Sequence, residues 1–511
     1  MTLATPSLDV PLTGKRLWFV GLILAFANFL VVLDTTIANV SIPNIAGGLS
    51  VSTTQGAWVI TSYAVADAIT VPLTGWLAMR YGPVRVFCTA MVMFAFWSFV
   101  CGFSHTLGLL VTARVMQGLS GGPMIPLSQT LLIRIFGKGR GGAAAGIWAV
   151  TTLLAPVFGP ILGGELCDRL SWPWIFYVNV PIALACAFAA WRMLGGRDDK
   201  PARVPVDFIG LLLLVVWVGA FQIMLDKGRE LDWFASPFIV TLAIIAIVGL
   251  ISFVLWELTA ENPVVDLSVF RSPAFRYSTL VISLGFAAFF AGWIILPLWL
   301  QINLNYTATT AGFAFSLNGI LAVMVAPLVA RLLGKVDARK LVTGGLLFAA
   351  GTMIWRTGFA SNIDFWGVGL LNLLQGMAMP FFFIPLVGLS LIDFQGQKVA
   401  SAAGLMSFMR TTAGAFGASL MLTEWDNDTG VARSEITRSM PNAEQMIQKL
   451  QSQGFSMEQA RAQLEYIVSS QAVMQATLHV FYILATMLCI AAALIWLVPR
   501  PKAPVAMATG H

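Results

Sequence analysis

Long apolar stretches separated by short polar turns run along most of the chain. They fall at about 17–40, 54–78, 84–104, 107–132, 143–166, 173–194, 206–226, 236–257, 276–301, 310–333, 340–359, 365–391, 399–424 and 473–498. Each is close to the roughly 20 residues that a helix needs to cross a bilayer core. A β-barrel would instead show shorter, alternating segments. The pattern therefore predicts an all-α polytopic membrane protein with fourteen transmembrane helices.

Basic residues are distributed unevenly between the two sets of loops. The short loops of one set contain only Arg169, Lys227 and Arg229, whereas the other set contains most of the remaining Lys and Arg. Loops rich in Lys and Arg stay in the cytoplasm. We therefore expect both termini, 1–16 and 499–511, to be cytoplasmic, which requires an even number of helices.

The two halves of the chain resemble each other. Three pairs of segments recur in order at a nearly constant separation: Pro72–Arg85 with Pro327–Lys340, Gln117–Leu127 with Gln375–Leu386, and Ala144–Gly159 with Ala402–Gly417. Similar strings also arise from helix packing through small residues, but three ordered matches favour a true repeat. Parallel repeats are typical of transporters with a site at the repeat interface.

The repeat divides the chain into two six-helix bundles, at 17–204 and 259–498, joined by two extra helices at 205–258. The second bundle contains a polar, Gln-rich segment at about 426–472, which we expect outside the cytoplasm. Its stretches "PNAEQMIQKLQSQ" and "SMEQARAQLEYIVSSQ" predict amphipathic helices, and Ser456 with Gln459 fits a capping box. This segment is either a solvated cap or a docking surface for a periplasmic partner.

Composition supports the membrane assignment and excludes several classes of function. Of 511 residues, 58% are hydrophobic and 11% are charged, and the mean hydropathy is +0.82. The net charge of +6 is spread over short loops, so we expect no nucleic-acid binding. Five scattered cysteines and three histidines predict neither a disulfide framework nor a metal site. A Walker A motif and a nucleophile–base pair are absent from the sequence, so we expect no enzyme activity.

Asp34 and Arg114 are candidate proton-coupling residues. Asp34 lies about 25 Å into the first helix, and Arg114 lies near the start of an antiparallel helix, so both fall in the outer half of the membrane. Ionisable residues at membrane depth usually serve function. The alternative is a permanent tie between two helices. Asp67, in the middle of the second helix, is a second proton site, a polar wall for substrate, or part of a satisfied network.

Other polar residues within the helices are candidates for the substrate cavity. They are Asn28, Thr35, Gln117, Gln129 and Arg410. Arg410 suits an anionic substrate or a partner carboxylate. Arg356, near a helix end, is expected to extend its head group to the interface, and Glu165 is expected to be solvated there.

Two further motifs suggest conformational change. Pro156, Gly159, Pro160, Gly163 and Gly164 lie in one helix, where prolines bend the axis and glycines permit close packing, as a hinge requires.

The second motif is a predicted cytoplasmic turn. It contains Gly75, Arg80, Gly82 and Arg85, which either anchor the topology or contribute to gating.

Several of these stretches resemble the major facilitator superfamily, in its fourteen-helix drug:proton antiporter branch. "LDTTIANVSIP" resembles the signature of helix 1, "RVMQG" that of helix 4, and "APVFGPILGG" the antiporter motif of helix 5. "QIMLDKGRELDWF", "WELTAENPVVDLSVFRSPAF" and "FMRTTAGAFG" resemble one group of multidrug exporters within that branch. The superfamily usually carries an Asp in the first cytoplasmic loop, where this chain has Met79. The gating contact of that Asp cannot form here in the same way.

The resemblance implies a multi-pass inner-membrane antiporter that exports hydrophobic or amphipathic toxic compounds in exchange for protons, without a bound cofactor. It implies roles for Asp34 and Arg114 in proton coupling. It also implies an EmrA-like periplasmic adaptor, a TolC-like outer-membrane channel and membrane lipids as partners. A narrower exporter of fatty acids or another anionic metabolite is the alternative. A scaffold that transports nothing has little reason to keep buried charges.

Overall fold

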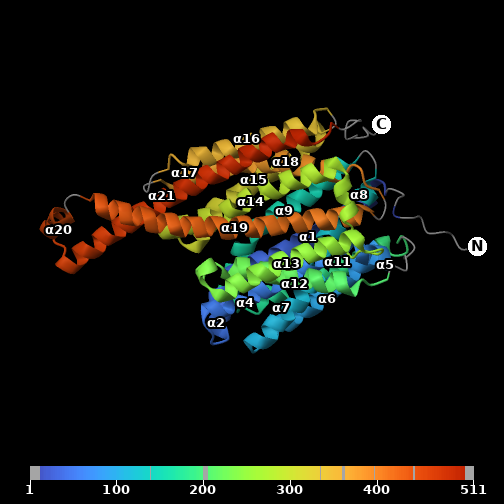
Figure 1. Cartoon of the computed structure of the whole chain (residues 1–511), viewed down its shortest axis with the longest axis horizontal. Helices are drawn as coiled ribbons and strands as arrows, with labels where there is room; N and C mark the ends of the chain where they lie inside the picture. The colour runs from blue at the N-terminus through green and yellow to red at the C-terminus, as the bar shows by residue number, and fades with distance from the viewer. Residues whose placement is uncertain are drawn as a thin grey trace, which may run out of the picture.

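The computed structural model describes residues 8, 12–137, 140–198, 205–333, 335–359, 363–395, 398–440 and 443–500; within these ranges a few side chains, including those of Pro156 and Pro160, lie outside the description. The described chain is built of helices and connecting turns and contains no β-strand. Figure 1 shows an elongated body of roughly aligned helices, with a helical hairpin projecting from one end and both termini at the other. We call these the hairpin end and the terminal end.

The first bundle comprises α1 to α11. Their bounds are α1 Gly14–Val40, α2 Ile42–Gly48, α3 Thr53–Gly56, α4 Trp58–Thr70, α5 Thr74–Tyr81, α6 Pro83–Gly102, α7 Leu107–Gly121, α8 Met124–Phe136, α9 Gly141–Arg169, α10 Trp174–Tyr177 and α11 Asn179–Leu194. Some predicted segments are split into two consecutive helices. Pro72 and Pro123 lie at two of these breaks, because proline has no N–H to donate.

Two linker helices and the second bundle follow. Their elements are α12 Phe208–Lys227, η1 Trp233–Ala235, α13 Pro237–Thr259, η2 Leu267–Arg271, α14 Pro273–Asn303, α15 Ala308–Leu332, α16 Ala338–Arg356, α17 Phe365–Gly376, α18 Ala378–Leu391, α19 Lys398–Ser439, α20 Ala443–Ser452, α21 Met457–Leu494 and η3 Ile495–Leu497. Each predicted apolar segment coincides with one helix or with two consecutive helices, except 54–78, which comprises α3, α4 and α5. Nine segments of the described chain are long and apolar enough to cross a membrane by length and composition. The total of fourteen crossings and the cytoplasmic termini stay predictions.

Helix pairing repeats between the two bundles. In the first bundle α1 packs extensively on α9, α4 on α7 and α6 on α11; in the second, α14 packs on α19, α15 on α17 and α16 on α21. The bundles meet through α9 against α15 and α18, and through α19 against α5 and α8. The repeat seen in the sequence therefore corresponds to a repeated packing arrangement.

The linker hairpin, formed by α12, η1 and α13, connects both bundles at its turn. Thr61 of α4 donates a hydrogen bond to Asp226 of α12, and Arg229 forms an ion pair with Asp426 of α19. The linker helices therefore contact the side of the body where α4 and α19 approach each other (Figure 1).

The projecting hairpin differs from the prediction. The apolar pattern placed helix ends near 424 and 473, but α19 continues unbroken to Ser439 and α21 already begins at Met457. An ion pair between Arg433 Nη2 and Glu465 Oε1, at 2.7 Å, joins the two extensions. The predicted capping box of Ser456 and Gln459 is confirmed at the start of α21, and α20 at the tip confirms the first amphipathic helix.

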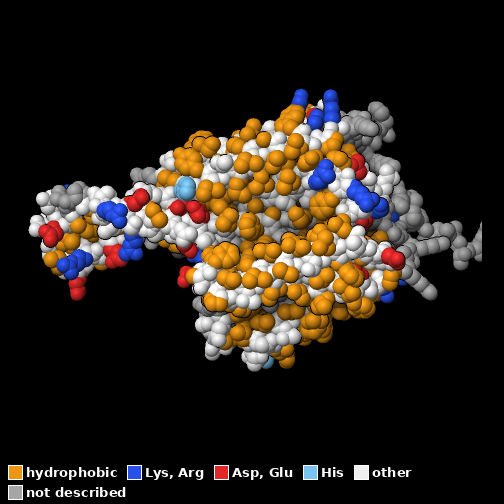
Figure 2. Space-filling model, in the orientation of Figure 1, with side chains coloured by type: hydrophobic (Ala, Val, Ile, Leu, Met, Phe, Trp, Pro, Cys, Tyr) orange, Lys and Arg blue, Asp and Glu red, His pale blue; other side chains and the backbone are white. Residues whose placement is uncertain are grey.

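The surface is divided into apolar and charged zones. Figure 2 shows hydrophobic side chains over the body, with Lys and Arg gathered near its terminal end and along the projecting hairpin. Large side chains such as Phe188 and Phe208 are more than 70% exposed. Extended exposed apolar surface of this kind fits contact with lipid.

Candidate functional site

Asp34 and Arg114 meet inside the first bundle. Arg114 Nη1 of α7 lies 2.6 Å from Asp34 Oδ2 of α1, and both side chains are 1% exposed. The predicted approach of the two helices at equal depth is therefore present in the structure. A buried ion pair is stable only if its remaining polar atoms are also bonded.

Two amide side chains complete the coordination of the Asp34 carboxylate. Asn179 of α11 donates to Oδ1 at 2.6 Å, and Gln117 donates to the same oxygen at 3.2 Å. Gln117 also accepts a hydrogen bond from Arg114 at 2.7 Å and donates to Ser98 at 2.6 Å. Gln117, predicted as a cavity residue, thus belongs to the Asp34 cluster.

The Arg114 guanidinium is further held by α4 and α10. Its Nε donates to the Val59 carbonyl at 3.0 Å, and its Cζ lies 4.2 Å from the ring centre of Tyr63 and 5.5 Å from that of Phe176. Protonation of the Asp34 carboxylate would weaken its hydrogen bonds to Arg114, Gln117 and Asn179. The cluster can therefore link a proton to the packing of six helices, α1, α4, α6, α7, α10 and α11.

A second polar layer lies where the bundles meet. Asn28 of α1 donates to Thr152 at 2.7 Å and to Thr151 at 3.2 Å, both on α9. Trp148, one turn away, donates to Ser128 at 3.2 Å and stacks on Phe383 of the second bundle with ring centres 5.6 Å apart. Asn28 is thus placed in the layer between the bundles, as a cavity residue would be.

Five predicted site residues contain buried polar atoms without hydrogen-bond partners among the described residues. They are Asn28, through Oδ1, Asp67, through Oδ1, Arg114, through Nη2, Gln129, through both amide atoms, and Arg410, through Nε and Nη1. Buried polar groups are rarely left unbonded in a resting protein. These atoms are therefore candidates for contacts with water or cargo.

Thr35 and Glu165 are not brought into either cluster. Thr35 donates to the Val32 carbonyl of its own helix at 2.8 Å. Glu165 is half exposed and pairs with Arg169 one turn along α9, which agrees with the expected solvated position.

The second bundle contains a counterpart of the Asp34 cluster without a carboxylate. Asn372, Gln375 and Arg356 follow Arg114, Gln117 and Ser98 by the same 258 positions. Arg356 is 1% exposed and donates to the side-chain oxygens of Asn372 and Gln375. The expectation that Arg356 reaches the interface is wrong, because α17 supplies two amide oxygens that hold its head group inside.

The conformational motif of α9 packs against α1. A Cβ added to Gly159 would lie 2.6 Å from Cβ of Thr36, and one added to Gly163 would lie 3.3 Å from the Ile37 carbonyl oxygen. Gly164 has open space at that position and does not take part in the contact. The helix is continuous through this region. The side chains of Pro156 and Pro160 lie outside the described residues.

At the terminal end, the predicted gating turn packs against α19. A Cβ added to Gly75 of α5 would lie 2.6 Å from Cα of Ser401, so only glycine allows this approach of the two bundles. Arg80 places its guanidinium 5.3 Å from the ring centre of Trp76. The bundles are therefore closed on each other at this point.

The gating turn has Met79 where the superfamily usually has an Asp, but a carboxylate from a distant segment, that of Asp198, bonds to the turn. Asp198 accepts hydrogen bonds from the backbone N–H groups of Val84 and Arg85, at 2.8 and 3.0 Å, at the start of α6. Gly82 has φ +91°, and a Cβ there would lie 2.6 Å from Asp198 Cγ. The negative charge suits a helix N-terminus. No local sequence pattern pointed to Asp198, because it lies over 110 residues away along the chain.

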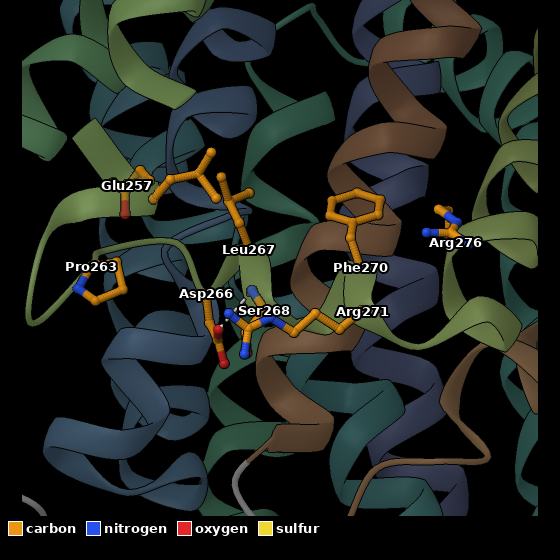
Figure 3. Close-up of a pocket in the computed structure, with 9 residues that line it drawn as sticks. Glu257, Pro263, Asp266, Leu267, Ser268, Phe270, Arg271 and Arg276 are labelled. Atoms are coloured by element: carbon orange, nitrogen blue, oxygen red, sulfur yellow. Dashed lines mark hydrogen bonds between the residues drawn. The ribbon is translucent and has the colours of Figure 1, made fainter. Parts of the chain in front are cut away.

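Two other features lie away from the interface between the bundles. Figure 3 shows a pocket between the end of α13 and η2, where Glu257, Asp266 and Arg271 bring charges of both signs. Near the base of the projecting hairpin, Glu424 and Asp428 of α19 approach His479 of α21. Neither feature contacts Asp34 or Arg410, so we assign neither to the transport site.

Comparison with known proteins decides the family. The signature of the Major Facilitator Superfamily matches residues 24–418. The chain belongs to the Major Facilitator Superfamily. Within it, the multidrug export protein EmrB of Escherichia coli K12 is 40% identical over 496 residues, covering 96% of this chain and 97% of that protein. The fatty acid resistance protein FarB of Neisseria gonorrhoeae is 40% identical over 495 residues, covering 96% and 98%.

A solved structure shows the same superfamily fold at low identity. The human organic anion transporter MFSD10 superposes with a TM-score of 0.56 and 14% identity, covering 93% of this chain and all of that one. The all-helical superfamily fold and the multi-pass membrane character predicted from the sequence are thereby confirmed. The identity to EmrB over nearly the whole chain also confirms the resemblance to multidrug exporters that several motifs carried.

Proposed function

We propose that this superfamily member is a proton-coupled antiporter of the inner membrane that exports hydrophobic or amphipathic toxic compounds. The observation that carries the proposal is the buried Asp34 carboxylate, bonded to Arg114, Gln117 and Asn179 from two other helices. Charges at membrane depth are costly and are kept where they move ions or cargo. The names of the EmrB relatives support the class of cargo.

Protonation of Asp34 supplies the coupling step. A neutral carboxyl group binds Arg114 less strongly, so α1 and α7 are free to adopt a second arrangement. Because α1 also packs on α9, that change reaches the layer between the bundles. Proton uptake on one face and release on the other then accompany outward movement of cargo.

The test is proton release from proteoliposomes during transport of a lipophilic cationic dye. We expect the wild-type protein to move protons when dye is added, and Asp34→Asn to move dye only down its own gradient. Glu165→Gln is the matched control, because that carboxylate is half exposed and outside the cluster. Proton coupling that persists in Asp34→Asn would overturn the proposal.

A narrower export of fatty acids or other anionic metabolites is the second candidate function. It is favoured by the buried Arg410 between the bundles and by the FarB relative. A panel of cationic, neutral and anionic ligands separates the two functions, since a narrow exporter binds only the anionic class.

We also propose that the projecting hairpin of α19, α20 and α21 contacts an EmrA-like periplasmic adaptor, which joins a TolC-like outer-membrane channel. Exposed apolar residues at the hairpin, including Val431, Met446 and Phe455, support a protein contact. Replacing 441–455 by a short glycine-rich loop should abolish co-purification with the adaptor and preserve transport in proteoliposomes. Retained co-purification would assign the adaptor contact to another surface.

A further inference from the structure

Arg410 occupies an aromatic enclosure between the two bundles. Its Cζ lies 5.3 Å from the ring centre of Trp148, 5.2 Å from that of Phe286 and 5.4 Å from that of Phe383. Trp148 belongs to α9 of the first bundle, whereas the other two rings belong to α14 and α18 of the second. A charged group there is surrounded by apolar surface from both halves of the molecule.

The guanidinium of Arg410 has unused hydrogen-bonding capacity. It is 2% exposed, and its Nε and Nη1 atoms bond to none of the described residues. The rings stabilise the cation through their faces, but they do not replace hydrogen-bond acceptors. A buried donor without an acceptor is destabilising, and more so when it is charged. An incoming anionic group would satisfy both nitrogens.

Asp67 of α4 is the carboxylate that faces Arg410 across the bundle interface. Gly404 of α19 packs against the carbonyl of Val71, with the ideal Cβ position 3.0 Å from that oxygen, which fixes the relative height of α19 and α4. From this contact Arg410 lies about 9 Å along α19 and Asp67 about 6 Å back along α4, in the same direction. The two charges attract each other, yet they form no direct hydrogen bond, and Asp67 Oδ1 has no partner among the described residues.

We propose that Arg410 is the subsite for the anionic head group of a carboxylate amphipath, and that Asp67 is the internal counterion with which this head group competes. The apolar tail of the amphipath packs on Trp148, Phe286 and Phe383. This assignment rests on the proposed export function and names one cargo class for its central site. It also means that Asp67, which attracts cationic cargo, lies close to Arg410, which repels such cargo.

Three probes of equal chain length test the assignment: dodecanoate, dodecyltrimethylammonium and dodecanol. Binding to the full-length protein in lipid nanodiscs is measured by scintillation proximity with radiolabelled probes. In Arg410→Gln we expect the affinity for dodecanoate to fall about tenfold relative to that for dodecyltrimethylammonium, and Arg410→Lys should lose less, since the charge remains. In Asp67→Asn we expect dodecanoate to bind about threefold to tenfold more tightly, because its competitor is gone.

The opposite effects of the two variants separate a specific subsite from general damage. Arg356→Gln is the matched control, since it removes another fully buried arginine of the second bundle that lies outside the aromatic enclosure. Monodisperse elution in gel filtration verifies folding. If Arg410→Gln fails to fold, the ratio of dodecanoate to dodecyltrimethylammonium affinity in Arg410→Lys tests the subsite instead. Equal weakening of all three probes in both Arg410 variants, or weaker dodecanoate binding in Asp67→Asn, would overturn the subsite.

Failure of this inference is distinguishable from failure of the export function. If Arg410 variants keep the wild-type ratio of affinities while proton release still accompanies dye export, the subsite is wrong and the antiporter stands. If proton release is absent from the wild-type protein, the antiporter itself is wrong.

Discussion

The Asp34 carboxylate is held by one charged partner and two neutral amide partners. Arg114 supplies the opposite charge, while Gln117 and Asn179 each donate a hydrogen bond to the other carboxylate oxygen. A hydrogen bond to a charged group contributes about 1.5–3 kcal/mol, and an uncompensated buried charge costs about 3–5 kcal/mol. The amides therefore adjust the strength of the cluster, whereas Arg114 decides whether it forms.

Removing Asn179 is expected to weaken the cluster without removing a charge. In Asn179→Ala the free energy of unfolding should fall by about 2 kcal/mol, since Asp34 loses one charge-assisted hydrogen bond. The measurement is thermal unfolding of the purified protein in detergent. Asn39→Ala is the control, because Asn39 is exposed on the same helix as Asp34. Equal unfolding temperatures for both variants would show that the Asn179 bond contributes nothing.

Individual residues show how far the sequence could predict the site. The meeting of Asp34 and Arg114 was predictable, because helix direction and residue spacing fix depth. Asn179 was not, since its contact depends on the rotation of α11 about its axis, which apolar spacing leaves open. Arg356 was assigned wrongly from its place near a helix end. The repeat held the missing signal: Arg356, Asn372 and Gln375 align with Ser98, Arg114 and Gln117, which predicts that Arg356 is buried.

Among the helices, α1 and α9 form an extensive contact through which the proposed coupling would reach the layer between the bundles. At Gly159 the two helices lie too close for a Cβ, and the neighbour across the interface is Thr36, two residues from Asp34. A change in the distance between these helices therefore acts close to the Asp34 cluster.

Adding one methyl group to a glycine of α9 should matter only where that glycine contacts α1. Gly159→Ala is expected to destabilise the protein by about 1–3 kcal/mol and to slow export, because the added carbon overlaps Thr36. Gly164→Ala, in open space on the same helix, should change neither quantity. Both are measured by thermal unfolding and by dye export from proteoliposomes. Equal effects at the two positions would refute the packing explanation.

Helix boundaries were predicted well inside the apolar zone and poorly beyond it. Apolar spacing located the buried parts of α19 and α21. It cannot detect the outer turns of these helices, because those turns are solvated on most sides and have no apolar stripe. The capping box at Ser456 succeeded, because it is a local signal that does not depend on burial. Tertiary pairing, such as the Arg433–Glu465 ion pair, was outside the reach of any local pattern.

On the scale of the whole molecule, the bundles are joined at both ends. The approach of Gly75 to Ser401 closes the terminal end, and the linker hairpin touches α4 through Asp226 and α19 through Arg229 near the hairpin end. Rocking of one bundle against the other must therefore alter at least one of these connections.

The ion pair of Arg229 with Asp426 should influence how readily the hairpin end opens. Exposed ion pairs contribute about 0–1 kcal/mol, so breaking this one should change the balance between conformations by up to about fivefold. We expect Arg229→Asp and Asp426→Arg each to alter the rate of dye export, and the double variant, with reversed charges, to restore it. A double variant no closer to wild type than the single ones would contradict a role for the pair.

The length of α19 has a mechanical consequence. This helix is a single element of 42 residues, about 63 Å long. It contains Ser401 at the contact with α5, Arg410 in the aromatic enclosure between the bundles, and one arm of the projecting hairpin. A stiff rod that pivots within the membrane amplifies a small rotation at its far end. With about 30 Å beyond the pivot, a tilt of about 10° displaces the tip by roughly 5 Å. We therefore expect the tip of the projecting hairpin to move during each transport cycle. A force that holds the tip still should slow transport.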